Sequence, residues 1–265
     1  MSKIKEFLKR KDVILSGKRY GIDALGAMAQ GLFCTLLVGT ILNTIGQQFH
    51  IGFLNAVIAT IGTGEGAAKY TIGGLASAMV GPGIAIAIGF ALHCPPLVLF
   101  SLIPVGFATN AMGGAGGPLA VYVVAIVATE CGKLISKETK IDILVTPIVT
   151  VLVGIGLAAL IASPIGKAAS AVGDAVKWAT VQQPFVMGVL VSVIVGIALT
   201  LPISSAAICA ALGLTGLAGG AAVAGCCAQM VGFAIMSFRE NRWGGLVAQG
   251  VGPSMLKMPN IIKNP

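Results

Sequence analysis

The sequence predicts an all-α, polytopic membrane protein with about seven to nine membrane segments, some broken or re-entrant, and with interfacial amphipathic helices. Charged residues make up only 10% of the 265 residues, and hydrophobic residues make up 56%. Soluble domains carry about 25% charged residues, so this chain has too few to cover a soluble fold. The charges also leave four long uncharged stretches, residues 24–64, 70–129, 143–166 and 178–238. Because one span needs about 20 apolar residues, each stretch can hold at least one.

Residues 1–20 form a basic segment ahead of the first apolar stretch. Its positive residues are Lys3, Lys5, Lys9, Arg10, Lys11, Lys18 and Arg19. Such an excess beside a span marks the cytoplasmic side, so we expect a cytoplasmic N-terminus. Phe7 and Leu8 would let the segment lie on the lipid bilayer as an amphipathic helix. A signal peptide fits poorly because the apolar stretch is too long. The clustering of the positive charge here also argues against nucleic acid as a partner.

Residues 21–265 are expected to form one transmembrane domain. Its long apolar segments lie at residues 21–46, 70–92, 119–131, 143–162, 184–201 and 215–238. Interfacial helices are expected at residues 164–178 and 243–258. Glycines and a proline at 73–83 predict a kink in the second segment. No strands are expected, since a lipid-embedded backbone satisfies its hydrogen bonds in helices or closed barrels and these apolar runs do not alternate.

Three apolar pieces are too short to cross a membrane: residues 51–62, 97–109 and 206–214. Each lies beside a break rich in glycine, proline or serine. Broken helices at corresponding positions are typical of transporters with a substrate site near the middle of the membrane. The similarity among the three pieces fits a structural repeat and a chance resemblance equally well.

Four ionisable residues inside or beside apolar stretches are candidate ligand contacts. Glu65 and Lys69 stand four apart, so on a helix they could pair. They either line a cavity or belong to a short solvent loop. Glu130 is a candidate contact or an ordinary carboxylate at a helix end. His93 is a candidate contact or a structural histidine before Cys94 and two prolines.

Neutral polar residues are the other candidates for substrate binding: Asn110, Ser204, Ser205 and Gln229. Such groups suit an uncharged, hydroxyl-rich solute. The sequence has no phosphate-binding loop of the Gly-x-x-x-x-Gly-Lys-Ser/Thr type, no catalytic Ser/His/Asp set, and no zinc or haem spacing among its cysteines. We therefore expect a permease component without a cofactor or bound metal, and not an enzyme.

The C-terminal third carries a resemblance to a known family. The runs are PFVMG at 184–188, LTLPISSAA at 199–207, LAGGAAVAGCCAQMVGF at 217–233 and ENRWGGLVAQG at 240–250. They resemble the membrane subunit IIC family of the phosphotransferase system, in the compact branch that includes the membrane regulator of a clostridial pore-forming toxin. Members of this branch run longer than 265 residues, so the resemblance implies a final segment missing here.

The resemblance implies a sugar permease whose IIA and IIB partners are separate proteins that carry out any phosphorylation. Related IIC proteins bind sugar through a Glu on a re-entrant loop and a nearby His. The usual Gly-Ile-Thr-Glu loop is absent here, and only the fragments Thr129-Glu130 and Gly64-Glu65 remain.

Our leading hypothesis is therefore a homodimeric permease that moves a small polar solute, a sugar by resemblance, by alternating access. Two alternatives stay open. One is a membrane regulator or sensor without transport, with the basic N-terminal segment binding its partner. The other is a proton-coupled transporter of a small anion, in which Lys69 would contact the substrate.

Overall fold

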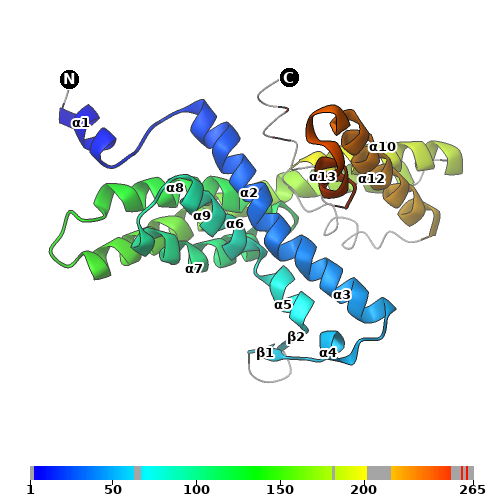
Figure 1. Cartoon of the computed structure of the whole chain (residues 1–265), viewed down its shortest axis with the longest axis horizontal. Coiled ribbons are helices and arrows are strands. Elements are labelled where there is room, and N and C mark those ends of the chain that lie inside the picture. Colours follow the sequence, from blue (N-terminus) through cyan, green and yellow to red (C-terminus); the bar gives the residue numbers. More distant parts are fainter. Residues whose placement is uncertain are drawn as a thin grey trace.

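The computed structural model describes residues 3–62, 67–180, 183–201, 216–251, 258 and 261, and helices dominate these ranges (Figure 1). The helices are α1 (Lys3–Arg10), α2 (Ala24–Leu32), α3 (Val38–Gln48), α4 (Gly52–Asn55), α5 (Ile72–Ala78), α6 (Val80–Ala91), α7 (Pro96–Gly113), α8 (Gly117–Ile135), α9 (Asp142–Thr180), α10 (Pro184–Thr200), α12 (Gly216–Met236) and α13 (Phe238–Val251). One π-helical segment, Arg19–Asp23, precedes α2, and another, Phe33–Leu37, joins α2 to α3, so that Arg19–Gln48 is one helical run.

The larger helix bundle contains α2, α6, α7, α8 and the first part of α9. Met28 of α2 is fully buried in its core. Glycines let the helix backbones approach closely: Gly31 of α2 lies against Gly83 of α6, and Gly81 of α6 lies against Gly106 of α7. A Cβ atom at any of these glycines would collide with the neighbouring helix. Close contacts between small residues are typical of helix packing in lipid, where apolar burial drives association only weakly.

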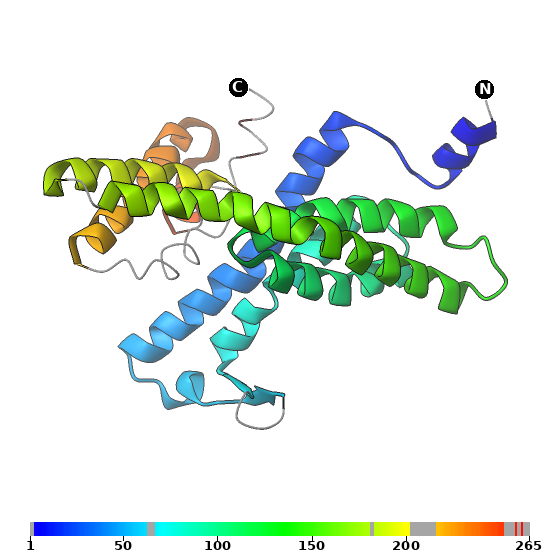
Figure 2. The same cartoon turned by 180° about the vertical axis from the view of Figure 1, so that it is seen from behind.

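The smaller bundle contains α10, α12 and the last part of α9. Its core includes Val176, Val191, Val195 and Ala222. Helix α9 has 39 residues and runs from one bundle to the other (Figure 2). At 1.5 Å per residue it is about 58 Å long, roughly twice the hydrocarbon thickness of a bilayer.

Among the described residues, four helical runs are long and apolar enough to cross a membrane: Arg19–Gln48, Pro96–Ile135, Asp142–Thr180 and Gly216–Met236. The bent pair α5 and α6 adds a fifth if it forms one span. Many large apolar side chains on these helices are exposed, among them Phe100, Leu152 and Leu160. Exposed apolar surface on this scale fits contact with lipid. The number of seven to nine membrane segments stays a prediction.

The run Pro96–Ile135 is a helical hairpin rather than one straight helix. The chain reverses at Gly114, where φ is 51°, a conformation that glycine adopts without steric cost. Gly132 near the end of α8 lies against Val98 near the start of α7, so the two helices are antiparallel. They contain 18 and 19 residues. The glycine-rich break expected after residue 109 is thus the hairpin turn.

The segment after α3 differs from the expected half-length helix. It contains the four-residue α4 and an antiparallel pair of strands, β1 (Ala59–Ile61) and β2 (Ala68–Tyr70). The prediction that no strands occur was wrong, because each short strand satisfies the backbone of the other. This pair of strands lies at the periphery, beyond α5 (Figure 1).

Two further expectations about helix length were wrong. Residues 97–109 belong to the 18-residue α7, which includes Pro104, and so do not form a half-length piece. Residues 143–162 and 164–178 belong to one helix, which passes through Pro164 without a break. A proline removes one helical hydrogen bond, but transmembrane helices tolerate this where neighbouring groups satisfy the freed carbonyl. The short piece expected at 206–214 lies outside the described residues.

The kink expected near residues 73–83 is present. Helices α5 and α6 meet at Met79 and are bent by 54°. The hydroxyl of Thr71 caps α5 by accepting a hydrogen bond from the amide of Gly74. The kink therefore divides this apolar segment into two helices of unequal length.

Candidate functional site

Charged side chains gather at one end of the larger bundle, where three chain connections meet. One connection precedes the first helical run, the second links α6 to α7, and the third links α8 to α9. We call this region the charged end and define it by Asp12, Arg19, His93, Glu130 and Lys133. A hydrogen bond and an ion pair join Asp12 to Lys133, which lie 121 positions apart in the sequence.

Lys133 is the best-buried member of the charged end, with a side chain only 1% exposed. Its ammonium donates to the carbonyl oxygens of Asp12, at 2.6 Å, and of Leu92, at 3.0 Å. The same nitrogen lies 3.1 Å from Glu130 Oε2, one turn earlier on α8. The two carbonyls take up two of the three donors of the ammonium, and the Glu130 carboxylate balances its charge. Lys133 thereby fastens the N-terminal segment and the end of α6 to α8.

Asp12 is the acceptor that faces most of the positive groups. Arg19 donates to both of its carboxylate oxygens, at 3.1 and 2.5 Å, and also to the carbonyl of Leu92 at 2.6 Å. This hydrogen bonding holds the pKa of the Asp12 carboxyl below its usual value, although partial desolvation opposes it. Asp12 also has a positive φ of 54°, which aspartate tolerates better than most residues. The segment therefore turns sharply at Asp12 before the first helical run begins.

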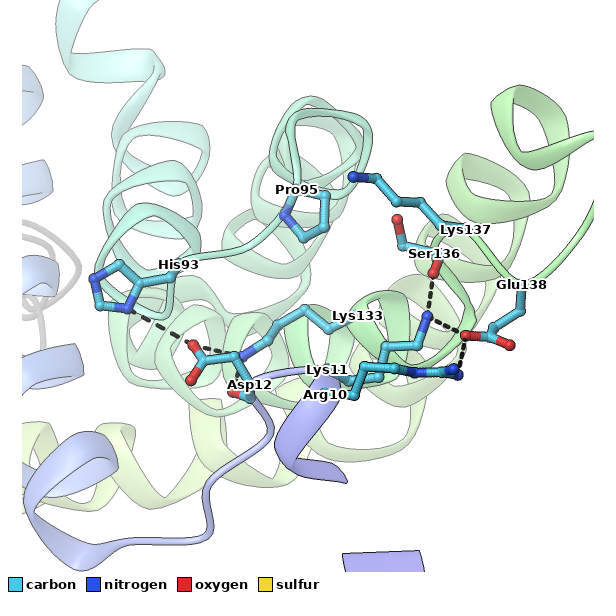
Figure 3. Close-up of a pocket in the computed structure, with 9 residues that line it drawn as sticks. All are labelled: Arg10, Lys11, Asp12, His93, Pro95, Lys133, Ser136, Lys137 and Glu138. Carbon is cyan, nitrogen blue, oxygen red and sulfur yellow. Dashed lines mark hydrogen bonds and ion pairs between the residues drawn. The ribbon is translucent and has the colours of Figure 1, made fainter. Parts of the chain in front are cut away.

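His93 occupies the left-handed position that ends α6. The amide of Cys94 donates to the carbonyl of Gly89 and that of His93 to Phe90, which is the pattern of a Schellman motif. Glycine is the usual residue at this position, but His93 adopts it with φ of 55°. Its imidazole is largely exposed, and Nδ1 lies 3.8 Å from Asp12 Oδ2 (Figure 3).

Glu130 lies beside Lys133, but its hydrogen-bonding capacity is largely unused. The residue is only 9% exposed, and neither carboxylate oxygen has a hydrogen bond within the described part of the chain. The buried hydroxyl of Tyr20 lies near Glu130 but makes no hydrogen bond of ordinary geometry with a described residue. Buried polar groups without partners are uncommon and require an explanation, such as a ligand or a bound water.

A second set of ion pairs ties α1 to the loop between α8 and α9. Glu138 Oε1 lies 2.7 Å from the Arg10 guanidinium and 2.5 Å from the Lys11 ammonium. Hydrogen bonds from these two cations lower the pKa of the Glu138 carboxyl. Lys11 also donates to the carbonyl of Ser136. These contacts hold the N-terminal segment against the bundle.

The charged end encloses a cavity of about 460 Å³. Its lining residues are Arg10, Lys11, Asp12, His93, Pro95, Lys133, Ser136, Lys137 and Glu138 (Figure 3). Volumes of this order accommodate small organic ligands. Groups of His, Cys, Asp and Glu that could hold a metal ion do not occur in the described ranges.

The structure brings together two of the predicted contact residues. His93 and Glu130 both belong to the charged end, linked through Asp12 and Lys133. Asn110 lies near the opposite end of α7, packed against Gly81 and Gly117.

The other predicted residues lie elsewhere. Lys69 is exposed on β2, opposite Thr60, so the helical pairing expected with Glu65 does not apply. Gln229 lies on α12 in the smaller bundle, where its amide donates to the Thr200 hydroxyl at 3.3 Å. Glu65, Ser204 and Ser205 lie outside the described residues. Substrate contact by any of these residues stays a prediction.

Asp12 and Lys133 were not among the predicted site residues. Lys133 follows the apolar segment expected at 119–131, and it is buried in the last turn of α8. The three-residue spacing of Glu130 and Lys133 was the available signal, because residues at that spacing share a helix face. No local signal connects Asp12 to Lys133.

Comparisons with known proteins place the chain in a family. The family described as "Phosphotransferase system, EIIC" matches residues 22–265. No curated protein and no solved structure matches the chain. Because the family match covers all but the N-terminal basic segment, the chain belongs to the EIIC family, the membrane permease components of the phosphotransferase system.

Proposed function

We propose that this chain binds a sugar and moves it across a bacterial inner membrane by alternating access, with its N-terminus in the cytoplasm. The observation that carries the proposal is the EIIC match over residues 22–265. Separate IIA and IIB proteins would supply the phosphoryl group, and two copies of the chain would form the working unit.

The bent pair α5 and α6 supports a mechanism with two conformations. Its 54° bend divides an apolar segment at Met79. On one side of the bend, Gly73 lies directly against Gly39 of α3; on the other, Gly81 lies against Gly106 of α7. Interrupted helices are the elements that transporters use to form and open a central site. A bend between two close-packed contacts is therefore a suitable hinge.

Glu130 is the predicted sugar contact that the geometry supports best. Its carboxylate is buried and accepts no hydrogen bond from the described residues. A carboxylate accepts hydrogen bonds from sugar hydroxyls, and these charge-assisted bonds are stronger than neutral ones. We propose His93 as its partner at the same end. The proposal keeps the remaining predicted residues as sugar contacts: Glu65, Lys69, Asn110, Ser204, Ser205 and Gln229.

Sugar binding and uptake by the full-length protein test the proposal. Purified protein in liposomes is assayed for uptake of labelled hexoses, hexitols and disaccharides, with and without the soluble phosphotransfer proteins. We expect uptake of one class, dependent on or accelerated by those proteins. Failure to bind or transport any of them would contradict the proposal.

The residue assignment has its own test. Glu130→Gln should weaken sugar binding about tenfold or more, since one charge-assisted hydrogen bond contributes about 1.5–3 kcal/mol. Asp174→Asn, which changes an exposed carboxylate on α9, is the matched control and should bind normally. Gel filtration confirms that both variants are folded. Unchanged affinity in both Glu65→Gln and Glu130→Gln would rule out these carboxylates as the site.

A further inference from the structure

We infer that the cavity at the charged end binds a phosphate group, carried either by a soluble phosphate compound or by the headgroup of an anionic lipid. The cavity adjoins the proposed sugar contacts, since His93 lines it, but Glu130 does not. The inference depends on the cavity's charge and unpartnered groups, and not on which solute is transported.

The charges of the cavity favour an anion. Four Lys or Arg side chains line it, against two carboxylates. The carboxylates are already engaged: Asp12 binds Arg19, and Glu138 binds both Arg10 and Lys11. Lys133 is engaged as well, by the carbonyls of Asp12 and Leu92 and by Glu130, so Lys137 is the lining cation left to a ligand among the described residues. Charge-assisted hydrogen bonds from such cations to phosphate oxygens are short and strong.

Two donors on the cavity wall have no hydrogen-bond partner among the described residues. The Ser136 hydroxyl is buried and makes no hydrogen bond with any described residue, and the residue is only 3% exposed. The next residue, Lys137, has a positive φ of 62°, and its ammonium makes no hydrogen bond or ion pair in the part of the chain described. Figure 3 shows the Lys137 side chain extending towards Pro95. A ligand in this cavity would meet a free ammonium and a free hydroxyl together.

The start of α7 also faces this wall. Pro95 lines the cavity and precedes Pro96, the first residue of this 18-residue helix. Neither proline has an amide hydrogen, so the helix start contributes the positive end of its dipole and no hydrogen bond from these two residues.

The cavity size and position define the class of ligand. At about 460 Å³ it exceeds the volume that a bare phosphate ion needs and suits a larger molecule that carries one. It lies where the chain connections meet at the end of the apolar helices, which is also the depth of lipid headgroups. A phosphate monoester and a phospholipid headgroup share the chemistry that these donors recognise.

The experiment has two arms with the full chain in nanodiscs. In the first, the lipid is phosphatidylcholine alone, and binding of inorganic phosphate is measured by calorimetry against chloride at the same ionic strength. In the second, the discs contain phosphatidylglycerol as well, and native mass spectrometry measures which lipid stays bound. Binding in the first arm identifies a soluble phosphate compound as the ligand. Selective retention of phosphatidylglycerol alone identifies a headgroup.

Variants of adjacent loop residues decide whether the cavity is responsible. Lys137→Gln should weaken binding about tenfold, and Ser136→Ala about threefold, in whichever arm shows binding. Lys140→Gln is the matched control: it removes a positive charge from the same loop, where the side chain is exposed and outside the cavity, and should change affinity by about twofold or less. No binding in either arm, or binding that Lys137→Gln leaves unchanged, would overturn the inference.

Discussion

Replacing Lys133 with methionine removes the ammonium that holds the charged end together. The side chain is 1% exposed, and its nitrogen has contacts of 2.6 Å to the Asp12 carbonyl, 3.0 Å to the Leu92 carbonyl and 3.1 Å to the Glu130 carboxylate. Methionine is similar in length and keeps most of the packing. The loss in free energy of unfolding therefore comes from the groups left without a partner.

The size of that loss follows from the chemistry of the three acceptors. Removing one member of a buried ion pair costs about 3–5 kcal/mol, because the remaining charge is uncompensated. Glu130 would be that remaining charge, since Lys133 is its ion-pair partner at 3.1 Å. The two carbonyls would each lose a charge-assisted hydrogen bond as well. We expect Lys133→Met to lower the free energy of unfolding by about 4 kcal/mol.

A double variant separates the two contributions. In Glu130→Gln/Lys133→Met the buried carboxylate is neutral, so only the orphaned carbonyls remain. We expect the double variant to regain about 2 kcal/mol relative to Lys133→Met alone. Lys140→Met is the matched control on the exposed loop and should lie within about 0.5 kcal/mol of the wild type.

Equilibrium unfolding in mixed micelles, followed by far-ultraviolet circular dichroism, measures these differences. The assignment of Lys133 as the central contact would be refuted by a Lys133→Met variant within about 1 kcal/mol of the wild type. It would also be refuted if the double variant were no more stable than Lys133→Met.

Three further results are expected. Gly106→Ala should lower the free energy of unfolding by about 1–3 kcal/mol, since its new Cβ meets the backbone of α6. Gly156 faces open space on α9, so Gly156→Ala should be neutral or stabilising. The same micelle unfolding assay compares the two variants. Asp12 has a lowered pKa, so its contribution to folding stability is present above about pH 4 and is lost as the pH falls through that lowered value. The difference in Tm between the wild type and Asp12→Asn should therefore vanish at the acid end of a pH series. Burial raises the pKa of the Cys94 thiol to about 11, so alkylation at pH 8, followed by peptide mass spectrometry, should be about 100-fold slower in the folded protein than after denaturation; equal rates would contradict the burial.

Much of the helical architecture was accessible from the sequence, because it depends on local signals. The first span, the kink near Met79 and the reversal at Gly114 each follow from apolar length or from glycine and proline. The β-hairpin and the continuous α9 were missed. Strand pairing between residues 59–61 and 68–70 replaced the end of the short helix expected at 51–62. Packing around Pro164 kept α9 continuous where the sequence predicts a break.

The candidate site was only partly accessible. Glu130 and His93 were selected because ionisable residues are rare in apolar stretches. Asp12 was hidden within a strongly charged segment, and Lys133 within an ordinary basic loop. Their contact joins residues 121 positions apart, and only the packing of the N-terminal segment onto α8 reveals it.

Helix α9 sets the rotational register between the two bundles. Ala158 lies in one core and Val176 in the other, separated by about five helical turns, so both face the same side of the helix. Inserting or deleting a single residue between them would turn one bundle by about 100° relative to the other. Exposed positions between them, such as Leu160, should therefore tolerate substitution far better than this stretch tolerates a change in length.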